Sequence, residues 1–315
     1  MKHHVNIAVN RTPKTIAGTP APDSGAGRTG IVVQLLLFVC ALLPVAPVTA
    51  AILTVNCATG PFFTINAAVT AAANGDTVMV EGCAVPYIEN VTIAGFTGLH
   101  VVGVTPPDPT GAGGDFGAKP AGVGAAVNSQ TVVNGAGLGG ACFDIQDSGD
   151  VKIQNFSLVN CTQGGVRIRS SKRVLVLANR IISHPNSTGI LAINTDDLQI
   201  SSNLIAVTGQ EGIMLDGTRL STVADNFIVR AGSAGIRLSA GANNRVDNND
   251  VRLSGAQGLV VSGAEARIER NSFVQSAAAA DILVDAASVN ADVVGNSVPA
   301  GIVDSGAGSE LANNF

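Results

Sequence analysis

The chain of 315 residues is weakly acidic, with a formal net charge of −5, and only 3% of its residues are aromatic and 13% charged. It shows no basic stripe between aromatics, so nucleic acid is not an expected partner, because binding to a phosphate backbone depends on clustered Lys and Arg. Glycine is abundant, tryptophan is absent, and the apolar residues are mostly Ala, Val, Ile and Leu, a composition that favours β-strands of small side chains.

The first 50 residues have the features of a leader. An uncharged apolar run covers residues 31–43, and the small-residue sequence Val-Thr-Ala follows at residues 48–50. This is the pattern of a secretory signal peptide cleaved near Ala50, and the run is too short to span a bilayer unaided. We therefore expect a secreted protein, extracellular or periplasmic, with no stable membrane span after cleavage. A retained membrane anchor is the alternative.

The cysteine count indicates disulfides. Cys40 lies in the leader, which leaves Cys57, Cys83, Cys142 and Cys161. An even number of cysteines in a secreted chain favours two disulfides. Sequence order favours pairing the first with the second and the third with the fourth, although four cysteines allow three pairings. Free buried thiols are the alternative.

Residues 51–104 are expected to form an N-terminal cap and the first coils. The pattern indicates a short helix with Thr64 as N-cap and a stop at Gly75, followed by a strand. A helix with an apolar face can cover the open end of a stacked repeat. Residues 105–128, rich in Pro, Gly and Ala, are expected to form a loop insertion, with a disordered insertion as the alternative.

Residues 129–315 carry a repeat of about 22–25 residues. Asparagine recurs once per unit, at positions 155, 179, 203, 226, 249, 271 and 296. A second register runs in phase through Cys142, Gly165, Gly189, Gly212, Gly235, Gly258 and Asp281. Each unit contains short alternating runs separated by Gly, Asn or Ser turns and no helical period. Such strands cannot bury a face alone, so they predict an all-β solenoid of three strands per coil, a parallel β-helix.

The position within each unit predicts the direction of the side chain. The first and third residues after the Gly register are apolar in most units and alternate with outward residues, so they are expected to form the core. The recurring Asn is expected at an inward turn, where each amide donates to one neighbouring coil and accepts from the other. A row of ligand-binding amides is the alternative.

The segment FFTINAAVTAAANGDTVMVEGCAVPYIENVTIAG, residues 62–95, resembles the opening of the pectin-lyase-like superfamily. In that superfamily a Thr-Ile-x-x-Ala-Val helix precedes Gly-Asp-Thr, a strand and a Tyr-x-Glu-Asn-Val phrase. The later units resemble right-handed parallel β-helix repeats, and together the resemblance covers about residues 53–300. It implies a right-handed parallel β-helix but no single reaction, because the superfamily includes lyases, hydrolases, esterases, epimerases and non-enzymatic surface proteins. The phrases of polygalacturonases, pectin methylesterases and pectate lyases are incomplete or missing.

The alignment of units predicts surface neighbours, because matching positions in adjacent coils lie about 4.8 Å apart. The candidate catalytic residues are Asp144, Arg167, Arg169 and Asp216, and the candidate substrate-binding residues are Gln146, Asn194, Asp196, Asp197 and Arg237. Carboxylates beside guanidinium groups suit uronate chemistry, which needs calcium or a proton acceptor beside a group that neutralises the substrate's carboxylate. Exposed ion pairs without a ligand are the alternative.

The histidines and aspartates give no strong metal pattern. His100 and His184 have no partner at a recognisable metal spacing, so neither zinc nor a His-based triad is expected, and His184 is expected in a turn. Asp144, Asp147 and Asp150 are candidates for calcium around a turn, with solvated aspartates as the alternative.

Two classes of function fit these observations. The first is a secreted protein that binds or processes a polysaccharide or cell-surface glycan on its outward strand face, as a lyase, hydrolase or epimerase would. The second is a non-catalytic structural or adhesive solenoid. The outward column supplies Leu191, Met214 and Val260 where aromatic residues would stack on sugars, and an exposed apolar column favours a partner.

Overall fold

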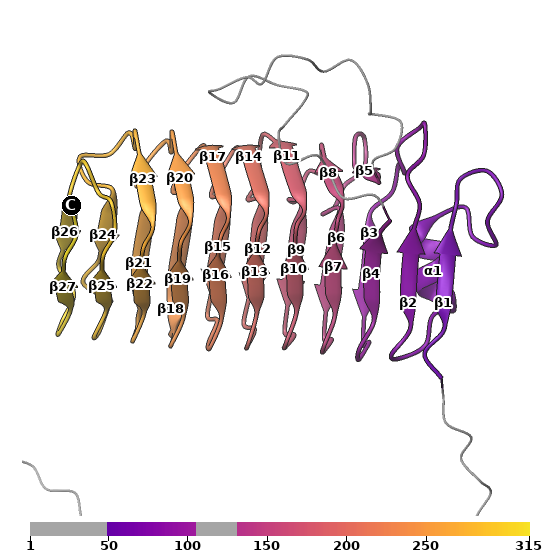
Figure 1. Cartoon of the computed structure of the whole chain (residues 1–315), viewed down its shortest axis with the longest axis horizontal. Helices are drawn as coiled ribbons and strands as arrows, with labels where there is room; N and C mark the ends of the chain where they lie inside the picture. Colours follow the sequence, from indigo (N-terminus) through magenta and orange to yellow (C-terminus); the bar gives the residue numbers. More distant parts are fainter. Residues whose placement is uncertain (1–48, 105–130) are drawn as a thin grey trace, which may run out of the picture. The chain divides into compact units, whose positions relative to one another are not determined.

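The computed structural model describes residues 49–104 and 131–315. The predicted apolar run at 31–43, Cys40 and the insertion at 105–128 lie outside the described residues. The described part belongs to one compact unit, Val48–Phe315, in which successive coils stack and most of them contribute a strand to each of three parallel sheets (Figure 1). This architecture confirms the predicted all-β parallel β-helix. None of the helices found in the described residues has the length and apolar character needed to cross a membrane.

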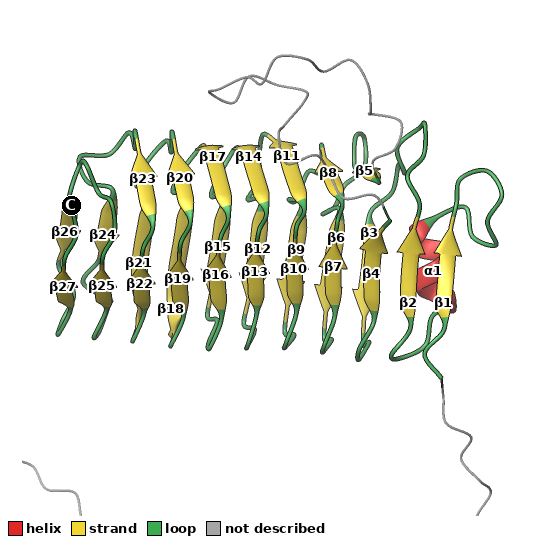
Figure 2. Ribbon diagram, in the orientation of Figure 1, coloured by secondary structure: helices red, strands yellow, loops and turns green. Residues whose placement is uncertain are grey.

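The three sheets are named A, B and C, and nearly all of the secondary structure is strand (Figure 2). Sheet A consists of β1 (Ile52–Val55), β2 (Thr77–Val80), β4 (His100–Gly103), β7 (Lys152–Gln154), β10 (Leu175–Leu177), β13 (Gln199–Ser201), β16 (Thr222–Ala224), β19 (Arg245–Asp247), β22 (Arg267–Glu269), β25 (Asp292–Val294) and β27 (Glu310–Ala312). Sheet B consists of β5 (Val132–Asn134), β8 (Ser157–Val159), β11 (Arg180–His184), β14 (Leu204–Thr208), β17 (Phe227–Ala231), β20 (Asp250–Arg252) and β23 (Ser272–Val274). Sheet C consists of β3 (Val91–Ala94), β6 (Phe143–Gln146), β9 (Val166–Arg169), β12 (Ile190–Ile193), β15 (Ile213–Asp216), β18 (Ile236–Ala242), β21 (Leu259–Ala264), β24 (Ile282–Val284) and β26 (Ile302–Asp304).

The core fills the space between the three sheets. The predicted inward pairs of sheet C are almost fully buried: Phe143/Ile145, Val166/Ile168, Ile190/Ala192, Ile213/Leu215, Ile236/Leu238, Leu259/Val261 and Ile282/Val284. Sheets A and B contribute their own inward rows of Val, Ile and Leu to the same core. Each of the larger side chains contributes about 1.5–3 kcal/mol by leaving water, so stacking stabilises coils that could not fold alone.

A short helix covers the N-terminal end of the core. Helix α1 (Ile65–Ala71) begins at Thr64, whose side chain accepts a hydrogen bond from the backbone N–H of Ala67, as the N-cap prediction required. The carboxylate of Glu89 accepts from the backbone N–H groups of Ile65 and Asn66 at 2.8 and 2.9 Å, which satisfies two more free donors of the first turn. The helix thereby closes one end of the solenoid.

An asparagine ladder runs through the turn between sheets A and B. In each of its inner rungs the side-chain oxygen accepts from the backbone N–H and from Nδ2 of the preceding coil's asparagine, at 2.9–3.2 Å. The rungs are Asn179, Asn203, Asn226, Asn249, Asn271, Asn296 and Asn314. The buried amides of the ladder therefore find partners in neighbouring coils, as the repeat predicted.

The first rung corrects the sequence interpretation. Asn155 was expected in the ladder, but Phe156 occupies that place and donates its backbone N–H to the side chain of Asn179 at 3.0 Å. Asn155 instead takes the left-handed corner one residue earlier, with φ 64°, a conformation that asparagine tolerates well. The repeat also missed the last rung, Asn314, because the final step is 18 residues.

The Gly register marks a place of close backbone approach. A Cβ at Gly189 would lie 2.6 Å from the carbonyl oxygen of Gly212 and 2.6 Å from Cγ2 of Ile205. Glycine is required here by space rather than by backbone conformation, since φ of Gly189 is not positive. The ends of the column, Cys142 and Asp281, are not glycine.

Both predicted disulfides are present, Cys57–Cys83 and Cys142–Cys161.

His184 lies beside the second disulfide and was expected in a turn. That expectation was wrong, because His184 ends strand β11 and is fully buried, with Nδ1 at 3.0 Å from the carbonyl oxygen of Cys161. Burial lowers the pKa of His184 despite this carbonyl contact, so the residue has a structural role in the coil.

Candidate functional site

The predicted site residues lie on or beside the outward side of sheet C. We define the sheet C face as the outward side chains of strands β6, β9, β12, β15 and β18. Parallel pairing places Asp144 beside Arg167 and Gln146 beside Arg169, on the adjacent strands β6 and β9. Because residues alternate along a strand, these four side chains all point away from the core.

Asp144 joins two arginines in the first cluster of the sheet C face. Arg167 donates from Nε and Nη2 to the two carboxylate oxygens of Asp144, at 3.1 and 2.7 Å. Arg169 donates from Nη2 to Asp144 at 2.9 Å and to Gln146 at 3.1 Å, and Arg167 also hydrogen-bonds Gln163 through Nη1. The side chain of Asp144 is 14% exposed, so its carboxylate is shielded, and two arginines for one carboxylate leave the cluster with a net positive charge.

The electrostatics of Asp144 argue against a role as an acid or base. Burial alone would raise its pKa, but the hydrogen bonds and charges of Arg167 and Arg169 outweigh burial and hold the pKa of Asp144 below its ordinary value. A carboxylate that two guanidinium groups keep ionised is a weak proton acceptor. Its effect is to hold the arginines in a fixed orientation toward the surface.

A second cluster lies three coils further along the same face. Arg237 on β18 donates from Nε to the carboxylate of Glu211 at 3.0 Å, and Ser233 donates to the same oxygen at 3.3 Å. Glu211 was not among the predicted residues. The sequence does carry a signal, since three matching positions in other units are alanine (Ala141, Ala234 and Ala280).

An apolar stretch separates the two clusters. Leu191 on β12 pairs with Arg167 on one side and with Met214 on β15 on the other, and Met214 pairs in turn with Arg237. The side chains of Leu191 and Met214 are partly exposed on the sheet C face. The face therefore alternates along the solenoid from charged to apolar and back to charged.

The remaining predicted residues do not join Asp144. Asp216 is on β15, two coils from Arg169 in the same column, which is about 10 Å by strand spacing. Asp196 forms an exposed ion pair with Arg219 at 2.9 Å, at the corner between sheets C and A. Asn194 and Asp197 occupy left-handed corner positions, with φ 50° and 57°.

The same corner holds a shallow groove of about 590 Å³. Its lining is polar and consists of Thr97, Asp147, Ser148, Gly149, Ser170, Ser171, Lys172, Arg173, Asn194 and Asp196. Ser170, which lines the groove, directly follows Arg169 of the first cluster in the chain. It offers hydroxyl, amide and charged groups, which suit a polar ligand.

Two of the three calcium candidates are engaged by arginine side chains. Asp144 is engaged by the arginines of the first cluster, and Asp150 forms an ion pair with Arg173 at 2.5 Å. Within residues 49–104 and 131–315, no group of three or more His, Cys, Asp or Glu side chains is arranged to hold a metal ion.

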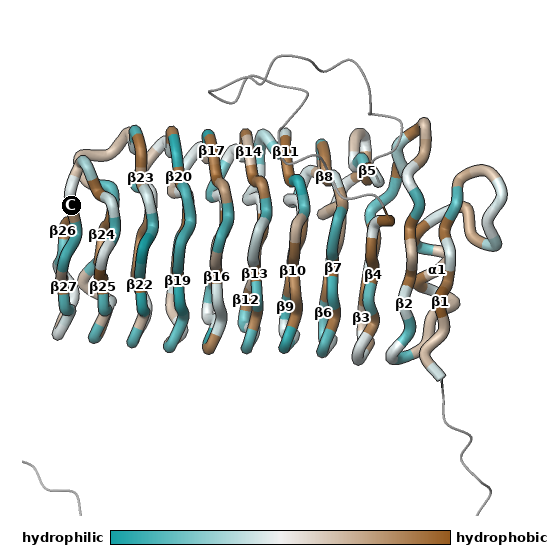
Figure 3. The backbone as a smooth tube through the Cα atoms, in the orientation of Figure 1, coloured by the Kyte–Doolittle hydropathy of each residue, from teal (hydrophilic) through white to brown (hydrophobic). Residues whose placement is uncertain are grey.

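Sheet A carries another ion-pair cluster that the sequence interpretation did not single out. Arg245 and Arg267 both bond Glu269, while Arg245 and Arg270 both bond Asp247. Both carboxylates are about 90% shielded, and this region is hydrophilic over β19 and β22 (Figure 3). Each carboxylate is already shared by two arginines, so the cluster ties adjacent coils together.

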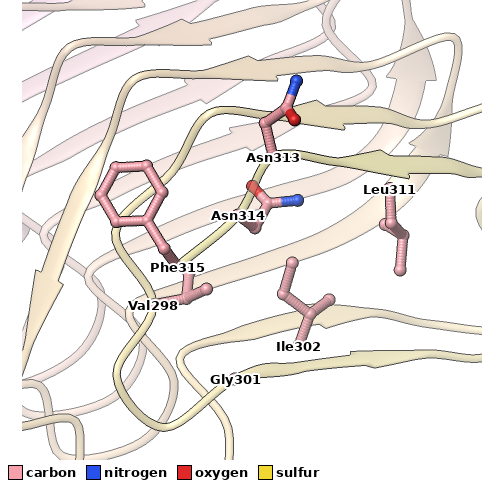
Figure 4. A pocket seen from close by; sticks show the side chains of 7 residues that line it. All are labelled: Val298, Gly301, Ile302, Leu311, Asn313, Asn314 and Phe315. Carbon is pink, nitrogen blue, oxygen red and sulfur yellow. The ribbon is translucent and has the colours of Figure 1, made fainter.

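A cavity of about 360 Å³ opens at the last coil. Figure 4 shows its lining, which is Val298, Gly301, Ile302, Leu311, Asn313, Asn314 and Phe315. These side chains carry no charged group.

Comparison with known proteins agrees with the architecture. The family described as right handed beta helix region matches residues 122–278. The chain is a right-handed parallel β-helix protein with a pectin-lyase-like fold. No curated protein sequence matches this β-helix protein.

Solved structures resemble the β-helix protein at low sequence identity. A protein of Geobacillus virus E2, ORF18, has a TM-score of 0.54 and 10% identity over 84% of this chain and 60% of its own. The periplasmic alginate epimerase AlgG has a TM-score of 0.49 and 12% identity over 77% of this chain and 61% of its own. The catalytic unit of a GH87 α-1,3-glucanase from Streptomyces thermodiastaticus has a TM-score of 0.48 and 15% identity over 85% of this chain and 56% of its own. The chain thus spans about six tenths of the length of these structures, and the likeness concerns the fold.

Proposed function

We propose that this β-helix protein binds an acidic polysaccharide outside the cytoplasm, along the sheet C face. One observation carries the proposal: Asp144 and Gln146 hold Arg167 and Arg169 in place on the outward side of two adjacent strands. The cluster contains two guanidinium groups for one carboxylate, which leaves a net positive charge. Guanidinium groups recognise carboxylates through paired hydrogen bonds, so a uronate or another acidic sugar is the matching ligand.

The geometry favours binding over cleavage. Processing by a lyase, hydrolase or epimerase needs an available proton acceptor or donor beside the bound sugar. The arginines hold Asp144 ionised and engage its carboxylate oxygens, and Asp216 lies two coils from Arg169. The candidate substrate-binding residues Asn194 and Asp196 border the corner groove next to the first cluster, where they can contact sugar hydroxyl groups.

Secretion is part of the same proposal. Disulfides form and persist in oxidising compartments, and this chain has two. A leader with the pattern of a signal peptide at residues 1–50 agrees with an extracellular or periplasmic location.

Binding measured by calorimetry tests the proposed function. The purified protein is expected to bind polygalacturonate or alginate and not the neutral polymer dextran, with affinity that falls as salt is raised. Arg167→Gln is expected to weaken binding about tenfold or more, since a hydrogen bond to a charged group contributes about 1.5–3 kcal/mol. Calcium as a cofactor is tested in the same titrations by adding it or chelating it.

Arg252→Gln is the matched control. Arg252 forms a similar ion pair with Asp250, at 2.5 Å, but on sheet B. This variant should bind as the wild type does. Absence of binding to every acidic polymer, or equal affinity of the Arg167 variant and the wild type, would contradict the proposal.

A further inference from the structure

We propose that the polysaccharide bound by the sheet C face carries its acid groups about three sugar units apart, with uncharged units between them. This inference rests on the proposed function and adds the spacing of charge along the ligand. It comes from the order of the four residues in one outward column: Arg167, Leu191, Met214 and Arg237.

The two arginines are separated by a fixed distance. They occupy the same position in coils three steps apart, and each step is about 4.8 Å, so their backbones lie about 14 Å apart. A pyranose unit in an extended glycan is about as long as one step. A glycan that lies parallel to the solenoid axis would therefore meet the two arginines three units apart.

Both guanidinium groups bond to a carboxylate of the preceding coil. Arg167 is bonded to Asp144 and Arg237 to Glu211, and each carboxylate belongs to the preceding coil. Along the solenoid axis, both charged groups are therefore displaced toward the preceding coil, so their axial separation stays close to that of the backbones. Their side chains are 23% and 31% exposed, so each is partly shielded and still open to solvent. Such fixed donors lose little conformational entropy on binding.

The two intervening positions, Leu191 and Met214, disfavour a charged group on the ligand. An acid group over Leu191 or Met214 would lose water and gain no hydrogen-bond partner, which is unfavourable. Asp216, two residues from Met214 on β15, adds a negative charge next to the apolar stretch. The carbon-rich face of a sugar ring, or an esterified acid, would instead pack against both side chains. A polymer with an acid on every unit is therefore a poorer ligand than one with sparse acids.

A series of polygalacturonates tests the spacing with one backbone. The series has four members, which differ in the fraction of carboxyl groups that carry a methyl ester. The fractions are none, one third, two thirds and all. The purified protein is expected to bind the two-thirds esterified polymer best, about tenfold tighter than the unesterified one, because burying an unpaired charge costs at least about 1.4 kcal/mol. Binding to the fully esterified polymer should be lost.

A double variant, Leu191→Lys with Met214→Lys, supplies a converse test. It places positive charges at both intervening positions and should move the preference to the unesterified polymer. Leu177→Lys is the control, because Leu177 is a partly exposed outward residue of β10 on sheet A, and it should leave the preference unchanged. Circular dichroism verifies that each variant is folded.

The outcomes separate the two claims. Affinity that falls steadily as esterification increases would overturn the spacing while the proposed function stands. No binding to any member of the series would overturn both. A preference that the double variant does not change would also overturn the spacing, since the apolar stretch would then have no part in recognition.

Discussion

Asp144 shows how one residue couples stability to charge. Its bonds with Arg167 and Arg169 lower its pKa in the folded state, so folding is favoured wherever the carboxylate is ionised. Asp144→Asn should reduce the free energy of unfolding by about 1–2 kcal/mol at neutral pH, a modest value because Arg169 is partly exposed.

The pH dependence of this loss has a definite sign. A lowered folded pKa stabilises the protein above the ordinary aspartate pKa of about 4, and the contribution disappears as the pH falls through the folded value. Urea unfolding from pH 7 to pH 3 should therefore show the wild type and Asp144→Asn converging in acid. A constant difference across this range would contradict the assignment.

Gly189 is a residue whose identity is set by space. A Cβ there would meet a carbonyl oxygen and a buried methyl group, each at 2.6 Å, so Gly189→Ala should destabilise the protein by about 1–3 kcal/mol. Gly139→Ala is the matched control, because a Cβ at Gly139 meets nothing within 4 Å. Thermal unfolding of the two variants compares them directly, and equal melting temperatures would rule out close approach as the reason for glycine.

Among the elements, the asparagine ladder contributes partners that no single coil contains. Asn226 donates to Asn249, Ile200 and Ala224 and accepts twice from Asn203. Asn226→Ala should therefore lower the free energy of unfolding by about 2–4 kcal/mol, since each buried group left unpaired costs about 1–3 kcal/mol.

The end of the ladder supplies the comparison for that variant. Asn314 lies in the last described coil and is partly exposed, so water can replace its bonds in Asn314→Ala. Its effect in equilibrium urea unfolding should be about 1 kcal/mol or less. Equal effects at both positions would mean that burial of the amides is not what stabilises the ladder.

Strands and turns were predictable from the sequence because their period is repeated in every coil. The inward pairs, the N-cap at Thr64 and both disulfides followed from alternation, capping and cysteine order. The error at Asn155 has a physical cause, because asparagine favours both the left-handed corner and the ladder position next to it. A repeat period fixes the coil but does not distinguish two adjacent positions that accept the same residue.

At the scale of the whole molecule, the stacking of coils makes residues at matching positions of the repeat neighbours on one surface. Register alone predicted that Asp144, Arg167 and Arg169 meet, because they lie in adjacent coils of one sheet. It did not predict the partner of Arg237, since Glu211 lies at the corner before its strand and reaches the next coil through its side chain. The orientation of a long side chain depends on how it packs against its neighbours. An alignment of the repeats gives only its position along the strand.

Methyl NMR of methionine tests most directly whether ligand binds the sheet C face. Met214 lies between the two arginine clusters, while Met79, on β2 of sheet A, is an internal reference in the same sample. Addition of two-thirds esterified polygalacturonate should shift the methyl signal of Met214 and leave that of Met79 unchanged. An unchanged Met214 signal under conditions where calorimetry detects binding would contradict the account, because the ligand would then occupy another face.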